Sequence, residues 1–354
     1  MQDQGREGRD EPQAPVVLDE LDLMIVNALQ LRPRAPWRLV GQALGIDAVT
    51  AARRWKRLSD SGAAWVDGYL SPADEGRVLA QVEVVTEAAR TAEVARHLVY
   101  DPQAMSVKQT SGARDLLVIA WAHSLDGIFG YVGERIARLP GVRSTRTHVI
   151  TAAPFEGSQW RLRCLDAGQR AVLGAAAPAA RNVPDEPLRP GDRELAVVLG
   201  EDGRMPLNQL AERIGTSVAT ARRRLDRLIS GRHVVLRCNL ARPLTGFPVS
   251  AVYFASVPAG HLDAAAASLR TLPELRLCTV TAGPHNLILD VWLRGIHDVH
   301  RLEAHLEQQL VRVGFRVEDR AVVLRTEKNV GRVLDGRGHS VATVPMALPG
   351  PGQG

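Results

Sequence analysis

The spacing of apolar residues divides the chain into two kinds of segment. Near its start, apolar side chains recur every three or four positions, as at Leu21, Ile25 and Leu29, which predicts amphipathic helices. This spacing continues to about Leu70, and from Val78 onward the apolar runs become short and strand-like. The same change occurs again in the second half of the chain. Each half therefore predicts a helical part followed by a mixed part.

The mixed part of each half predicts the order β-α-β-β-α-β, which is the ferredoxin-like arrangement. Helices cover one face of such a sheet, and the other face needs a partner. Strands are predicted at 78–85, 116–121 and 142–150, and in the second half at 249–257, 287–293 and 316–324. Helices are predicted at 91–99, 128–139, 261–272 and 299–310.

A direct repeat accounts for this recurrence. Residues 50–58 read TAARRWKRL and residues 220–228 read TARRRLDRL, so six of nine positions are identical at an offset of 170. At the same offset, an identical residue type follows Asp22, Arg34, Gly45 and Leu70. A period this long is typical of a duplicated module and not of a solenoid.

The repeat and its flanks predict five segments. The stretch between the halves is rich in Ala and Pro and lacks an apolar period, which is typical of a linker. The first 15 residues and the Gly- and Pro-rich tail from Gly336 onward are expected to be disordered. The segments are a helix-turn-helix domain at 16–72, an effector domain at 76–173, a linker at 174–187, a second helix-turn-helix domain at 188–242 and a second effector domain at 246–335.

The third predicted helix of each half has the features of a DNA-recognition helix. A glycine marks the turn before it, Gly45 in one copy and Gly215 in the other. If Ala51, Trp55 and Leu58 form its buried stripe, arginines occupy the opposite face. The positions expected to meet DNA are Val49, Thr50, Ala52, Arg53, Lys56 and Arg57, and in the second copy Ala219, Thr220, Arg222, Arg223 and Arg227.

These arginines suit both parts of a protein–DNA contact. Arginine is the commonest reader of guanine in the major groove, and further arginines bind phosphates. An ordinary solvated basic helix would present the same face, so one copy alone would not decide between the two readings. The recurrence of this face in the same helical context favours DNA.

Composition narrows the function classes. The chain of 354 residues carries 44 Lys plus Arg against 39 acidic residues, and nearly all of its positive charge is arginine. No apolar run approaches the length of a membrane span, and the start lacks the hydrophobic segment of a secretory signal. Three distant cysteines exclude a disulfide framework, and 4% aromatic residues argue against single-strand base stacking. We therefore expect a cytoplasmic protein without membrane contact.

Enzyme and metal motifs are absent from the sequence. His297, His300 and His305 share a predicted helix, but its apolar stripe places them on the solvated side. Trp55 and Trp121 fall on apolar faces and predict core positions. There is no phosphate-binding loop, dinucleotide fingerprint or nucleophile elbow. The sequence therefore predicts no metal, no cofactor and no catalysis.

The motifs together resemble those of the leucine-responsive regulatory protein (Lrp/AsnC) family. The resemblance is carried by LDELD at 18–22, the helix-turn-helix at 44–58, GARD at 112–115 and PGV at 140–142. The second copy is similar through 210–228 and 283–289 but lacks Pro-Gly-Val. The resemblance implies an α+β fold, with a duplicated unit of winged-type helix-turn-helix followed by a ferredoxin-like effector domain that dimerises through its sheet. It also implies a transcription regulator that binds double-stranded DNA and, in many members, a small molecule such as an amino acid.

This chain departs from the family pattern because both protomers lie on one polypeptide. The linker holds the copies at high local concentration, so we expect the two sheets to cover each other. One chain would then act as a pseudo-dimer, and such chains would associate further into a homo-oligomer.

The loops that follow the family's signature are candidates for effector binding. Gly112 and Ala113 could offer backbone N–H groups to a carboxylate, and Asp115 could hold an ammonium. In the second copy, Asn286 is neutral where Asp115 is charged. Both loops could equally be plain turns, which Gly and Asp favour. The candidate effector residues are Gly112, Ala113, Arg114, Asp115, Gly283, His285 and Asn286.

Two other functions remain open from the sequence. Sirohaem decarboxylases resemble Lrp-type proteins and some are fusions of two such units, so a tetrapyrrole-modifying enzyme is the main alternative. A non-specific nucleoid or RNA binder is the second. The arginine-rich helix in both copies favours the sequence-specific regulator.

Overall fold

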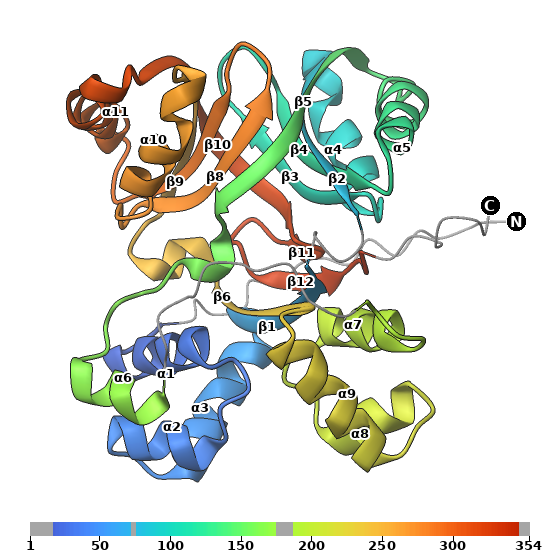
Figure 1. Cartoon of the computed structure of the whole chain (residues 1–354), viewed down its shortest axis with the longest axis vertical. Helices are drawn as coiled ribbons and strands as arrows, with labels where there is room; N and C mark the ends of the chain where they lie inside the picture. Colours follow the sequence, from blue (N-terminus) through green and yellow to red (C-terminus); the bar gives the residue numbers. More distant parts are fainter. Residues whose placement is uncertain (1–16, 72–75, 175–186, 347–354) are drawn as a thin grey trace, which may run out of the picture.

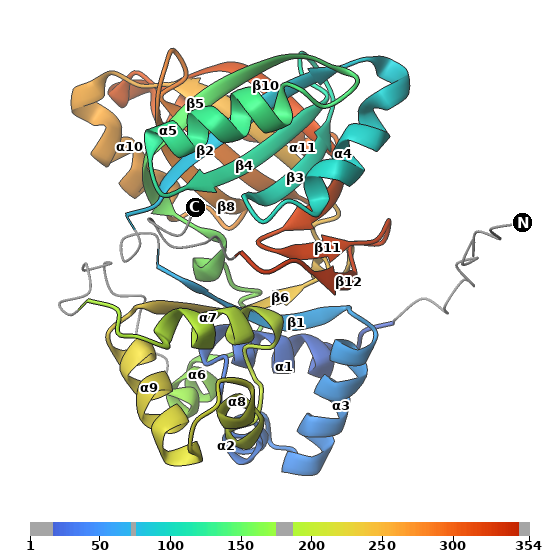
Figure 2. The same cartoon turned by 90° about the vertical axis from the view of Figure 1, so that its right-hand side faces the viewer.

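The computed structural model describes residues 17–71, 76–174 and 187–346. Two helical domains lie side by side beneath a layer of β-sheet and helices, and a two-stranded ribbon separates the layers (Figures 1 and 2). Both copies contribute to every layer. Within the helix-turn-helix and effector parts of each copy, the order of elements follows the pattern of apolar residues, and the ribbon between these parts does not.

Each helical domain contains three helices in the helix-turn-helix order. Gly45 and Gly215 adopt the left-handed conformation in the turn before the third helix, with φ of 67° and 63°. The predicted stripe of Ala51, Trp55 and Leu58 is buried. The helices are α1 (Glu20–Leu31), α2 (Trp37–Leu44) and α3 (Ala48–Asp60), and then α7 (Asp192–Glu201), α8 (Leu207–Arg213) and α9 (Val218–Ser230).

The ribbon joins the two copies directly below the sheet layer. Strand β1 (Ala64–Leu70) pairs antiparallel with β6 (Val234–Leu240), with Ala64 opposite Leu240. The prediction of helix as far as Leu70 is therefore wrong for these last residues. Their backbone hydrogen bonds are made with the other copy, and local spacing of apolar residues does not report such a partner.

Eight strands of the effector domains form one closed antiparallel ring. The hydrogen-bonded order is β10-β3-β4-β2-β5-β8-β9-β7, and β7 pairs again with β10. The first copy supplies β2 (Val78–Thr86), β3 (Ala104–Thr110), β4 (Leu116–Ala122) and β5 (Val142–Phe155). The second copy supplies β7 (Val249–Ser256), β8 (Leu275–Ala282), β9 (Leu287–Leu293) and β10 (Arg316–Asn329).

Helices cover the outside of this ring (Figure 1). They are α4 (Thr91–Val99), α5 (Leu125–Gly130) with its continuation Tyr131–Ile136, α10 (Leu262–Leu269) and α11 (Asp298–Gln309). Single turns of 3-10 helix occur at Ala88–Arg90, Gly157–Gln159, Arg242–Thr245, Ala259–His261 and Val311–Val313. The predicted β-α-β-β-α-β order is confirmed in both copies.

The last strand of each copy is longer than predicted. Strand β5 runs to Phe155 and not to 150, and β10 runs to Asn329 and not to 324. The added residues pair with the other copy: Phe155 lies opposite Cys278, and Asn329 lies opposite Ser106. These extensions join the two sheets, and their partners lie more than 100 residues away in the sequence.

The inner faces of the two sheets cover each other, as the sequence predicts. Leu117 of the first copy packs with four apolar residues of the second, namely Val252, Phe254, Ile288 and Val323. Their burial removes apolar surface from water, worth about 1.5–3 kcal/mol for each fully buried large side chain. One chain thus completes the sheet interface that two protomers would otherwise form.

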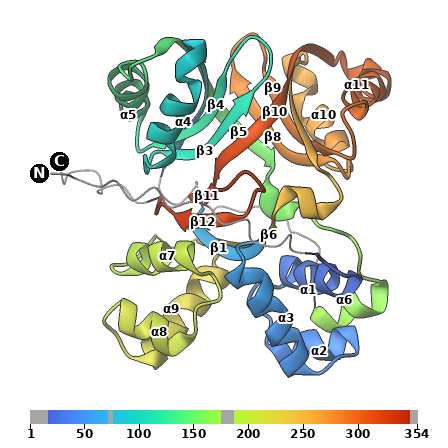
Figure 3. The same cartoon turned by 180° about the vertical axis from the view of Figure 1, so that it is seen from behind.

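Two segments lie where the sequence did not place them. Helix α6 (Ala167–Leu173), assigned to the first effector domain, packs on the first helical domain, where Leu165 and Leu173 join its core. The tail expected to be disordered contains β12 (Ser340–Thr343), which pairs with β11 (Arg332–Leu334) beside the ribbon (Figure 3). Backbone pairing orders this short strand. The first 15 residues, which are predicted to be disordered, lie outside the described residues. Most of the predicted linker lies outside them as well.

A reciprocal pair of arginines joins the helical domains. Arg34 of the first copy donates to the carbonyl oxygens of Gly203 and Met205, at 2.6 and 2.9 Å. Arg204 of the second copy donates to those of Pro33 and Ala35, at 2.5 and 3.0 Å. The repeat aligns these two arginines at an offset of 170. Each copy therefore supplies a hydrogen-bond donor for carbonyl oxygens of the other copy.

We predict that Arg34→Ala and Arg204→Ala each lower the free energy of unfolding by about 2 kcal/mol, because each removes two hydrogen bonds from a charged donor. Chemical denaturation measures this. Arg38→Ala, which removes an exposed arginine of the same domain, is the control and should have little effect. Unchanged stability in both variants would show that these contacts do not hold the domains together.

Candidate functional site

The exposed faces of α3 and α9 carry the arginines expected to read DNA. Val49 is 74% exposed at the start of α3, and Arg53 and Lys56 are exposed beyond it. On α9, the exposed residues of the corresponding face are Ala219, Arg222 and Arg223. Thr50, Ala52 and Thr220 are half-buried at the edges of these faces. Both helices run from the ribbon to the free end of the helical layer, with α2 and α8 between them (Figure 2).

Two of the candidate arginines make structural ion pairs within their own domains. Arg57 binds the buried carboxylate of Asp22, which also accepts from Arg54 at 3.0 Å. In the second copy, Arg227 binds the buried Asp192 in the same way. These pairs fix α3 against α1 and α9 against α7. Arg57 stays half exposed, whereas Arg227 is mostly covered.

The two reading faces differ in charge at one position. Lys56 of α3 forms an ion pair with Asp60 one turn further along, at 2.6 Å. At the corresponding place α9 has Asp226, which is exposed. An aspartate repels phosphate and can accept only from a base amine, that of cytosine or adenine, whereas a lysine binds phosphate or guanine. The exposed faces of the two helices therefore differ in chemistry.

The candidate effector loops occupy equivalent places in the two copies, and each braces the neighbouring strand. The Asp115 carboxylate accepts from the backbone N–H of Thr86 at 2.7 Å. In the second copy, the Asn286 amide accepts from the Val257 N–H at 3.0 Å and donates to the Val257 carbonyl at 2.7 Å. Gly112 has a φ of +92°, which only glycine adopts without strain. Ala113 and Gly283 are exposed.

Arg114 lies inside the contact between the copies. It is 3% exposed, pairs with Glu83 at 2.6 Å and with Asp319 of the second copy, and stacks on the Phe254 ring at 4.2 Å. Glu83 also binds His148, with 2.6 Å between Oε1 and Nε2. Burial raises the pKa of Glu83, but His148 and Arg114 outweigh it and hold that pKa below its ordinary value.

His285 completes this cluster from the second copy. Its half-buried ring lies 5.9 Å from Phe254 and 6.3 Å from His148, measured between ring centroids. The Nδ1 atom of His285 is buried and has no hydrogen-bond partner. The structure thus gathers Arg114 and His285 at the copy–copy contact, while Gly112 and Ala113 remain at the surface.

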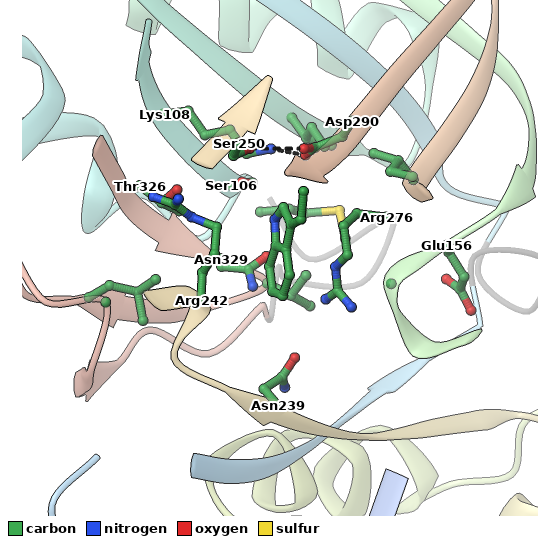
Figure 4. Close-up of a pocket in the computed structure, with 18 of the residues that line it drawn as sticks. Ser106, Lys108, Glu156, Asn239, Arg242, Ser250, Arg276, Asp290, Thr326 and Asn329 are labelled. Atoms are coloured by element: carbon green, nitrogen blue, oxygen red, sulfur yellow. Dashed lines mark hydrogen bonds and ion pairs between the residues drawn. The ribbon is translucent and has the colours of Figure 1, made fainter. Parts of the chain in front are cut away.

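A cavity of about 200 Å³ lies between the ribbon and the ring of strands, and the sequence did not reveal it. Its walls come from both copies, with Lys108 and Glu156 from the first and Arg242, Arg276 and Asp290 from the second (Figure 4). Asp290 lies on a predicted strand, whereas the other four residues lie outside the predicted strands, and nothing in the linear pattern shows that they converge. His297 lies directly before α11, and His300 and His305 lie in it; all three are exposed, and no cluster of three metal-ligating side chains occurs in the described residues.

Comparison with sequence families matches both helical domains and the first effector domain. An AsnC-type helix-turn-helix domain matches residues 18–59 and 191–229, and the Lrp/AsnC ligand binding domain matches residues 78–160. No described helix is long and apolar enough to cross a membrane.

Individual relatives match one copy of the repeat at a time. The HTH-type transcriptional regulator FL11 of Pyrococcus abyssi is 30% identical over 137 residues, covering 38% of this chain and 90% of the relative. The Bkd operon transcriptional regulator of Pseudomonas aeruginosa is 26% identical over 137 residues, covering 37% of this chain and 88% of the relative.

A solved structure matches the tandem arrangement as a whole. The siroheme decarboxylase NirDL superposes with a TM-score of 0.58 at 14% sequence identity, covering 88% of this chain and 93% of that one. At this identity the likeness shows the fold alone. The duplicated scaffold is therefore shared, whatever chemistry each protein performs.

The Glu83 cluster should make stability depend on pH. Because the pKa of Glu83 lies below its ordinary 4.5 in the folded protein, its stabilisation is present above that pH and is lost as the pH falls. Glu83→Gln should lower the free energy of unfolding at pH 7 by about 2 kcal/mol. The difference from the original chain should shrink toward pH 3.

Denaturant unfolding at a series of pH values gives this difference, with the surface variant Glu93→Gln as the control. A Glu83→Gln deficit that stays constant from pH 7 to 3 would contradict the account of the cluster.

Proposed function

Because the chain belongs to the Lrp/AsnC family of transcription regulators, we propose that it is a sequence-specific DNA-binding regulator whose two reading helices lie on one polypeptide. The observation that carries this proposal is the pair of exposed arginine faces on α3 and α9, held in one rigid frame by Arg34 and Arg204. A single chain thereby offers what the family's dimer offers.

Some arginines of α3 and α9 are paired with carboxylates and others are not, and this difference supports the proposed function. Arg54, Arg57 and Arg227 are engaged by carboxylates, so they orient the helices. Arg53 has no ion-pair partner among the described residues, and Arg223 makes one long contact with Thr220. These free guanidinium groups are available to base edges, and their neighbours are available to phosphates.

We further propose that an amino acid acts as effector at the loop containing Asp115. One oxygen of its carboxylate holds the Thr86 N–H, and the described residues make no hydrogen bond to the other, which can accept from an ammonium group. The adjacent Gly112 leaves space for the ligand's carboxylate near the backbone. In the second copy, both functional atoms of the Asn286 amide are occupied by Val257. Binding at one loop only is the expected consequence.

A tetrapyrrole-modifying enzyme is the second candidate, favoured by the shared scaffold with NirDL and by the arginines in the central cavity. Arginines would bind carboxylates of such a substrate. Among the described residues that line this cavity there is no histidine to transfer a proton. A strongly shifted Soret band on adding an iron tetrapyrrole, followed by loss of carbon dioxide, would establish the enzyme.

We predict that Arg53→Ala or Arg223→Ala weakens specific DNA binding by about 1–3 kcal/mol, because each removes a base contact. Electrophoretic mobility shift with a sequence selected by the protein measures the affinity. Both side chains are exposed, so folding should be unaffected.

Arg96→Ala serves as the matched control for these variants, since it removes an exposed arginine from α4 in the effector layer. Its affinity should match that of the original chain. If Arg53→Ala and Arg223→Ala behave like this control, α3 and α9 do not read DNA.

For the effector loop, we expect Asp115→Asn to abolish amino-acid binding while keeping the fold, because Asn retains an acceptor for the Thr86 N–H. Calorimetry with a panel of amino acids tests this. Asn286→Ala should leave binding intact but lower stability by about 1–2 kcal/mol, since it loses two backbone hydrogen bonds. Loss of binding in Asn286→Ala alone would reverse the assignment.

A further inference from the structure

The central cavity contains a buried cation that forms no ion pair with the described residues, although the Asp290 carboxylate is near enough to raise its pKa. Arg276 is 8% exposed and reaches from β8 into the cavity (Figure 4). Its guanidinium carbon lies 3.9 Å from the ring centroid of Trp292 and 4.7 Å from that of Trp160, and these two rings contact each other edge to face. No carboxylate of the described residues lies within ion-pair distance of it. Burial, together with the nearby Arg237, lowers the pKa of Arg276 to about 9.

Other cations of the cavity are also incompletely satisfied. One terminal nitrogen of Arg242 is buried without a hydrogen-bond partner, on the opposite side of the cavity from Arg276 (Figure 4). One terminal nitrogen of Arg237 lacks a hydrogen bond as well, whereas its Nε forms an ion pair with Asp67 at 3.5 Å. Buried donors are normally paired, so this set marks a place where an acceptor is missing.

The acidic residues that line the cavity do not supply the missing acceptor. Asp290 binds Lys108 and accepts from Ser250 at 3.2 Å. Glu156 accepts from the Tyr69 hydroxyl at 3.0 Å and from Ser158 at 2.6 Å. Asp335, the remaining acid, is engaged within its own turn. The cavity therefore favours an anion.

The remaining lining mixes apolar with neutral polar side chains, and three of its residues are aromatic. Trp65, Tyr69 and Trp292 line the space together with Met105 and Leu277. Such a lining, with a few convergent polar groups, is typical of sites for small organic ligands. A flat ring system would stack on these side chains while a charged group meets the arginine.

We propose that this cavity binds an aromatic carboxylate, whose carboxylate group forms an ion pair with Arg276. The site differs from the effector loops, which follow the other ends of β3 and β8. It contacts the ribbon strand β6 and the effector strands at once, so its occupant bridges the two layers. A role of this occupant in controlling DNA binding rests on the proposed regulatory function. Binding is measured on DNA-free protein, so its failure leaves the DNA-reading proposal standing.

The test uses 2-naphthoate as probe and the uncharged 2-naphthalenemethanol as its comparison, with binding followed by tryptophan fluorescence and calorimetry. The intact chain should bind the acid at least tenfold more tightly than the alcohol. Arg276→Gln should weaken binding of the acid at least tenfold, and Arg276→Lys should restore part of it. Arg325→Gln, which removes a lining arginine already paired with Glu327 at 3.1 Å, should stay within twofold.

Thermal unfolding without ligand separates binding from structure. Because Arg276 has no carboxylate to lose, Arg276→Gln should melt at or above the temperature of the original chain. The proposal is overturned if the acid does not bind, if acid and alcohol bind equally, or if Arg276→Gln leaves the affinity unchanged. A marked loss of melting temperature in Arg276→Gln and Arg276→Lys alike would make the arginine structural and would also overturn it.

Discussion

Each copy of the repeat is incomplete alone, and the contacts that complete it come from the other copy. Arg34 and Arg204 satisfy carbonyl oxygens across the gap between the helical domains, each in the loop that carries the other arginine. Strands β1 and β6 satisfy each other's backbone in the ribbon, and the long ends of β5 and β10 close the ring of strands. Unpaired buried backbone groups are costly, so these exchanges fix how the copies sit together.

These contacts between the copies explain how the duplication can serve function. In a dimer of identical chains, both reading helices must be the same. In this chain, α3 and α9 are held in one arrangement but differ in sequence. Lys56 on α3 and Asp226 on α9 show how far their exposed faces have diverged. The effector loops diverge in the same way, since Asp115 and Asn286 brace equivalent strands with different chemistry. Covalent linkage thus lets each site change independently while the interface is kept.

The sequence predicted the local features and missed those that depend on distant partners. Helix spacing located the third helix, its glycine turn and its buried stripe, because these follow from residues three or four positions apart. The strand β12 and the ends of β5 and β10 were missed, because their pairing partners are far away in the chain. Arg114 was predicted as a candidate effector-binding residue, yet Glu83 and Asp319 bind it inside the copy–copy contact. The cavity around Arg276 was invisible for the same reason.

Under the proposed function, one chain reads DNA as an asymmetric pair of linked domains. Selection of bound sequences from random DNA, followed by hydroxyl-radical footprinting on the selected site, tests it most directly. The account predicts two unlike half-sites about one helical turn apart, both protected by a single chain. A perfect palindrome with equal protection of both halves, or protection of one half alone, would contradict it.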